Sequence, residues 1–140
     1  MKKRIVAHEE HFTGVLWGIA AQVKEYQLCW HLNKTLGFEL KRGEDVEIIN
    51  RKKGKTSFFS FYRFKEDLDK WEVYVIANKH FGEFLIPEVK QTDFFLMIRG
   101  EVSEQQQAEL FLKLKSISVM QLVVKIDYHR LKSRENLIVE

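Results

Sequence analysis

Apolar residues recur along this 140-residue chain with two different periods, and the change between them predicts the secondary structure. Residues 12–21 are apolar but contain two glycines, which disfavours a helix and predicts a buried strand. Over residues 22–36 leucine recurs at every fourth position, which predicts an amphipathic helix. Gly37 then favours the left-handed conformation that ends a helix.

Alternating apolar and polar residues predict strands through the middle of the chain. One bent strand, or two short ones, is expected over residues 38–41 and 46–49. A turn that contains glycine then leads into a strand at 57–64, and this pairing predicts a hairpin. The charged link 65–70 leads into a strand at 71–78, which predicts a second hairpin.

The remainder of the chain continues both patterns. The predicted elements are an apolar loop that packs on the domain (81–88), a strand (94–99), a helix that begins at Ser103 with Gln106 completing a capping box, a strand (119–126) and a short edge strand (137–139).

This order of elements predicts an α+β fold in a single domain over residues 1–140. Two β-α-β units flank a β-meander, so we expect a mostly antiparallel sheet with two helices on one face. The plan resembles an enlarged ferredoxin-like or ACT-like sandwich. Residues 1–11 are expected to form a loosely packed N-terminal segment.

Two helices can cover only one face of such a sheet, yet several strands are apolar on both faces. The second face must be covered by the chain's own loop and tail, by a second copy of the chain, or by a ligand. The side chains expected there, as a candidate interface, are Phe59, Phe61, Tyr74, Ile76, Phe95 and Met97. A homodimer joined through this face or through an edge strand is the leading hypothesis for a partner.

Composition adds limits on partners and compartment. The chain is 45% hydrophobic and 31% charged, as in ordinary soluble domains. Its 23 Lys and Arg against 20 Asp and Glu leave a net charge of +3, too even to predict nucleic acid or an anionic membrane as the partner. The absence of an export signal and the single unpaired Cys29 predict a cytoplasmic protein.

Candidate chemistry is sparse, so neither an enzyme nor a cofactor is predicted. His8 and His11 are three residues apart, whereas the metalloprotease pattern needs histidines four apart. Cys29 and His31 lie on a helix at a spacing that points them away from each other. Cys29 is therefore expected in the core and His31 in solvent.

One group of residues resembles a known family signature. Ile86-Pro87-Glu88 followed by Asp93-Phe94 looks like the motif of the bacterial IPExxxVDY family, with Thr92 in place of Val and Phe94 in place of Tyr. The resemblance extends over residues 12–139 and implies no activity, ligand or cofactor. We expect structural roles for both acids, with Glu88 capping backbone amides in its turn and Asp93 starting a strand.

Three functions remain open at this point. The first is a non-enzymatic interaction or regulatory module that self-associates. The second is a small-ligand sensor of the ACT type, with a pocket between sheet edges or beneath the loop 81–87. The third is a single-stranded RNA-binding sheet, in which the basic cluster 51–55 would lie beside the rings of Phe59 and Phe61, although the even charge balance argues against it.

Overall fold

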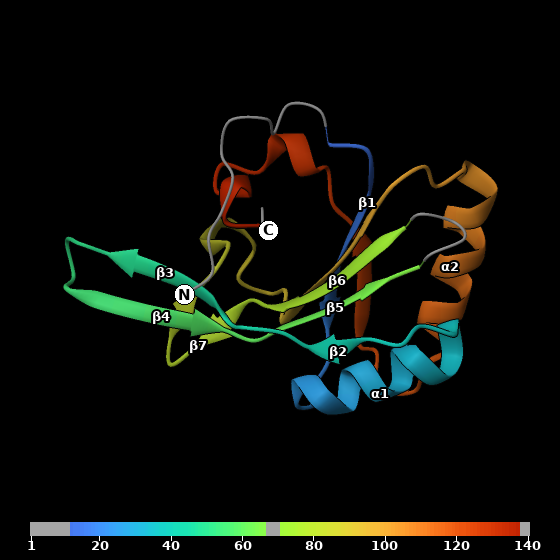
Figure 1. The fold of residues 1–140 in the computed structure, drawn as a ribbon, viewed down its shortest axis with the longest axis horizontal. Coiled ribbons are helices and arrows are strands. Elements are labelled where there is room, and N and C mark those ends of the chain that lie inside the picture. Colours follow the sequence, from blue (N-terminus) through green and yellow to red (C-terminus); the bar gives the residue numbers. More distant parts are fainter. Residues whose placement is uncertain (1–11, 67–70, 138–140) are drawn as a thin grey trace.

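A computed structural model describes residues 12–66 and 71–137 of the chain (Figure 1). It confirms the α+β class, with an antiparallel main sheet in the order β10-β1-β9-β6-β5-β2. The strands of this sheet are β1 (Gly14–Ala20), β2 (Lys41–Arg42), β5 (Phe61–Lys65), β6 (Glu72–Ala77), β9 (Phe94–Arg99) and β10 (Leu122–Lys125).

Two smaller hairpins extend from this sheet. β3 (Val46–Asn50) pairs with β4 (Lys55–Phe59), and this hairpin projects from the body at the left of Figure 1. β7 (Lys79–His80) pairs with β8 (Glu83–Phe84) beside it. The predicted glycine-containing turn is confirmed at Gly54, which has a φ of 64°.

The strand predicted at 57–64 is wrong, because the chain changes sheets at Ser60. β4 belongs to the projecting hairpin and β5 to the main sheet. At the break, the Ser60 carbonyl accepts a hydrogen bond from Ala77 N–H at 2.9 Å, and the Phe61 carbonyl accepts one from Gly43 N–H at 2.8 Å. Phe59 and Phe61 are both buried, so the alternation of buried and exposed residues continues across Ser60 and the sequence does not reveal the break.

One end of each helix lies where a local signal predicts it, although α1 begins three residues later than expected. α1 (Glu25–Leu36) ends at Gly37, which has a φ of 76°. α2 (Glu104–Ser116) begins with the expected capping box, in which Ser103 Oγ accepts from Gln106 N–H and the Gln106 side chain accepts from Ser103 N–H. These bonds satisfy backbone donors that a helix start leaves unpaired.

The two helices cover one face of the main sheet, as expected. Their apolar side chains pack against one set of alternating strand residues. Buried members of this layer from the helices are Leu28, Cys29, Leu32, Leu110 and Leu114, and from the strands Val15, Trp17, Ile19, Val73, Val75, Leu96 and Ile98. Neither helix is long and apolar enough to cross a membrane.

The second face of the sheet is covered by the chain itself. Leu85 and Ile86 of the predicted packing loop lie over it, together with Tyr128, Leu131 and Leu137. These last three belong to a segment with two 3-10 turns, η3 (Tyr128–Arg130) and η4 (Arg134–Leu137), which lies across the sheet from α1 in Figure 1. Val46 of β3 completes the cover.

The candidate interface on this face is therefore corrected. Its six side chains are between 0 and 3% exposed and form the interior of this chain: Phe59, Phe61, Tyr74, Ile76, Phe95 and Met97. A dimer cannot form through side chains that the chain already buries.

Of the edge strand predicted at 137–139, Leu137 lies in η4, and residues 138 and 139 lie outside the described part of the chain.

Candidate ligand-binding cleft

The loop after β8 is fastened to the sheet by Asn78, whose side chain is fully buried. Its Oδ1 accepts a hydrogen bond from Ile86 N–H at 2.8 Å, and its Nδ2 donates to the carbonyls of Thr92 at 2.9 Å and Val89 at 3.2 Å. The backbone of Asn78 also donates to Asp93 and accepts from Leu85. One residue thus holds both ends of the segment 85–93.

Glu88 joins this loop to the segment that carries η3 and η4. Its carboxylate accepts from Ser133 N–H at 2.7 Å and from Ser133 Oγ at 3.0 Å. These hydrogen bonds outweigh desolvation and lower the pKa of Glu88. Glu88 caps a backbone amide as expected, but of a distant segment rather than of its own turn. Asn136 adds a bond to the Leu85 carbonyl at 2.9 Å.

Asp93 performs the expected structural task at the start of β9. One carboxylate oxygen accepts from Ala21 N–H at 2.9 Å, and the other forms an ion pair with Lys79. The pair borders an open depression of about 520 Å³ at the start of α1. Phe94, which follows, is buried on the helix side of the sheet. Both carboxylate oxygens of Asp93 are thus used to hold strands together.

A more enclosed cavity lies beneath the loop 81–87, where the sensor hypothesis expects a pocket. Its volume is about 390 Å³, within the usual size range of small-molecule sites. We call it the hairpin cleft, because its walls come from both hairpins, the Pro87 loop and the η4 segment. Its lining residues are Ile48, Asn50, Lys53, Ser57, Phe59, Gly82, Glu83, Phe84, Leu85, Pro87, Lys90, Ser133 and Asn136.

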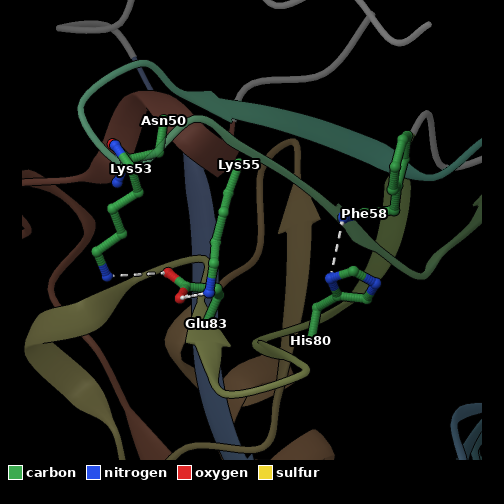
Figure 2. A network of polar contacts seen from close by, with 6 residues as sticks. All are labelled: Asn50, Lys53, Lys55, Phe58, His80 and Glu83. Carbon is green, nitrogen blue, oxygen red and sulfur yellow. Dashed lines mark hydrogen bonds and ion pairs between the residues drawn. The ribbon is translucent and has the colours of Figure 1, made fainter.

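Charged side chains gather at the mouth of this cleft. Glu83 lies between two lysines, with its carboxylate oxygens 3.5 Å from Lys53 Nζ and 3.6 Å from Lys55 Nζ (Figure 2). Lys90 Nζ lies 5.8 Å from the centre of the Phe84 ring. The cleft therefore combines apolar side chains such as Ile48 and Phe84 with ammonium groups near its opening. Ion pairs as long and exposed as these two are weak, so a stronger anion can replace Glu83 as the partner of the lysines.

The nucleophile that the sequence offers lies far from this cleft. Cys29 is on the helix side of the sheet, where burial raises the pKa of its thiol to about 12. His31 is half-buried, with its ring edge against Trp30 at a centroid distance of 5.0 Å, rather than fully solvated. No group of three His, Cys, Asp or Glu side chains in residues 12–66 and 71–137 could hold a metal ion. His8 and His11 lie outside the described residues.

Two other expectations can be compared with the structure. Phe59 and Phe61 are buried, so they cannot stack on bases as the RNA-binding hypothesis requires. Of the two routes to self-association, the sheet face is filled, whereas the edge strand β10 leaves Leu122 and Val124 partly exposed. Self-association through that edge remains a prediction.

Most residues of the cleft carry no signal in the sequence that would group them. They come from segments far apart in the chain, and only the apolar character of the Pro87 loop pointed to this place. Comparison with known proteins adds no relative: no family model, no curated protein and no solved structure matches the chain. The functional conclusion therefore depends on the geometry of the cleft.

Proposed function

We propose that the protein is a ligand-binding module that holds a small anion, bearing a carboxylate or phosphate group, in the hairpin cleft. The observation that carries this proposal is the cavity of about 390 Å³, closed by four chain segments and bordered by Lys53 and Lys90. Small-molecule sites are usually concave and combine apolar walls with polar groups that orient the ligand.

The lining suits a ligand that has an apolar part and an anionic group. An apolar part would contact Ile48, Phe84 and Pro87, which are the apolar lining residues that are not fully buried, while the anionic group would meet the lysines at the mouth. Ser57 and Asn136 add polar side chains to the wall. Amino acids and nucleotides both combine an anionic group with a less polar part, so both classes suit this arrangement.

A thermal-shift screen with amino acids, other small carboxylates and nucleotides tests the proposal. A ligand at 100 times its Kd stabilises the folded state by about 2.7 kcal/mol and raises the Tm measurably. Calorimetry on Lys90→Gln should then show Kd raised about tenfold or more, because a charge-assisted contact is lost.

Lys113→Gln is the matched control, since Lys113 is exposed on α2 away from the cleft. This variant should bind as the unmodified protein does. If no compound in the panel raises the Tm, or if the two variants lose affinity equally, the cleft is not an anion site.

A further inference from the structure

Phe81 has a backbone conformation that its side chain makes unfavourable. His80 pairs with Glu83, so Phe81 and Gly82 form a two-residue hairpin loop, and their φ values are 44° and 81°. Loops with positive φ at both positions are normally Asn-Gly, Asp-Gly or Gly-Gly. A bulky residue there is an outlier, and such strain tends to occur at functional sites.

The folded chain gains little packing in return for this strain. Phe81 is 91% exposed, and the ring contact it makes is with His80 at a centroid distance of 4.6 Å. A large apolar side chain held in water at a hairpin tip is well placed to contact a partner.

Other rings extend the same surface. His80 lies with its edge toward Phe58 at 6.1 Å, and its Nδ1 accepts a hydrogen bond from Phe58 N–H at 3.4 Å (Figure 2). Phe58 is itself 45% exposed on the outer side of β4, the side opposite the buried Phe59. Three aromatic rings are thus in contact in sequence across the two hairpins.

Positive charge adjoins these rings at the turn of the longer hairpin. Residues 50–56 contain four basic side chains and no acidic one, and all four are exposed. A strand rises about 3.4 Å per residue, so Phe58 lies about 10 Å along β4 from the end of this turn at Lys55, the length of about three stacked nucleotides. Lys53 and Lys55 are turned toward Glu83 (Figure 2), so we define the hairpin patch by the other two basic side chains and the three rings: Arg51, Lys52, Phe58, His80 and Phe81.

We propose that the hairpin patch binds single-stranded nucleic acid, with bases stacked on Phe81 and Phe58 and phosphates paired with Arg51 and Lys52. Exposed rings beside basic side chains provide the two contacts that such binding uses. An acidic protein as the partner would account for the basic side chains but not for the strained, exposed ring of Phe81. An anionic membrane would need a broad apolar face to enter the headgroup layer, whereas His80 places an imidazole at the centre of this patch.

The near-even net charge of the chain does not oppose this proposal. Phosphate contacts depend on local charge, and the turn at 51–55 concentrates four of the 23 basic residues in one exposed position. The rings that contact the bases are also different from Phe59 and Phe61, which the fold buries. This binding is independent of the proposed small ligand, because Arg51, Lys52 and Phe81 do not line the cleft.

The test measures fluorescence anisotropy of a labelled mixed-sequence 12-nucleotide strand, as RNA and as DNA, titrated with the full chain. Two phosphate contacts predict a slope of about −1.4 in log K against log salt, so affinity should fall about sevenfold between 50 and 200 mM salt. A duplex of the same sequence, vesicles of anionic lipid and polyglutamate are added in turn as competitors of the labelled strand.

Phe81→Asn separates function from folding, because asparagine tolerates positive φ. We expect its Tm to rise by a few degrees while affinity for the strand falls at least fivefold, as expected for a lost stacking contact. Arg51→Gln combined with Lys52→Gln should weaken binding and make the salt slope shallower by about 1.4.

Trp30→Gln is the control for the ring, since Trp30 is an exposed aromatic residue on α1. Lys113→Gln with Lys115→Gln is the control for charge. Both should bind as the unmodified protein does. The proposal is overturned if the strand does not bind at 50 mM salt, if Phe81→Asn binds normally, if the controls lose as much affinity, or if vesicles or polyglutamate bind more tightly than the strand.

Discussion

Replacement of Asn78 by alanine tests whether one buried amide holds the cover of the second sheet face. The substitution removes three side-chain hydrogen bonds, two of them to the buried backbone groups Ile86 N–H and Thr92 C=O, and the third to Val89 C=O, which lies in a less buried position. A buried polar group left unpaired costs about 1–3 kcal/mol, whereas a group that water can reach costs less. We therefore expect Asn78→Ala to lower the free energy of unfolding by about 3–4 kcal/mol.

Urea unfolding followed by tryptophan fluorescence at neutral pH measures this loss, and hydrogen exchange at Ile86 N–H locates it. Asn33→Ala is the matched control, because Asn33 also bonds to a backbone N–H and C=O, both of Leu40, but is only half-buried. Its loss should be about 1 kcal/mol. If the two variants lose the same stability, or if Ile86 N–H exchanges as slowly in Asn78→Ala as before, Asn78 does not hold the loop.

Three shorter predictions follow from the same structure. The pKa of Glu88 is lowered in the folded state, so its stabilising effect is complete above its ordinary pKa and is lost as pH falls through the lower, folded value. The difference in stability between the unmodified chain and Glu88→Gln, measured in urea, should therefore shrink between pH 7 and pH 3. A constant difference would contradict the role of Ser133. Cys29, with a pKa of about 12, should react with a thiol reagent at pH 8 only after unfolding, and prompt labelling of the native protein would show that it is accessible. Phe59→Ser with Phe61→Ser should abolish cooperative unfolding, because each buried ring is worth about 3–5 kcal/mol; a folded variant with native circular dichroism would contradict the assignment of both rings to the core.

Much of the fold could be predicted because its signals are local. Gly37 and the pair Ser103 and Gln106 mark helix ends through bonds within a few residues, and the structure has both. The apolar run at 94–98, with Gly100 after it, likewise predicted β9 at its observed bounds. Such signals depend on backbone geometry that neighbouring residues determine.

The cover of the second face could not be predicted in the same way. Tyr128 and Leu137 lie in short 3-10 turns and Leu131 follows the first of these turns, so their spacing matches neither a helix nor a strand. The change of sheet at Ser60 was not predictable either, because alternate residues remain buried on both sides of it. The sequence indicated that a cover was needed, but long-range contacts such as that of Glu88 with Ser133 decide which segment provides it.

The sequence indicated the region of the candidate site but not most of the residues that line it. An apolar loop around Pro87 pointed to the right region, whereas the lysines and the polar wall come from other segments. The dipeptide Phe81-Gly82 is itself a local signal, because glycine at the second position favours a two-residue hairpin loop in which phenylalanine is an unusual first residue. The exposure of Phe81 became evident only with the fold.

The position of β1 in the sheet has a consequence for how the chain folds. β1 is the first described strand, yet both of its neighbours, β9 and β10, come late in the chain. Pairing strands so distant in sequence requires closing long loops, which slows folding relative to a protein of the same size with local contacts. During synthesis β1 therefore stays unpaired until residues 94–99 have left the ribosome, and one of its edges stays open until residues 122–125 follow.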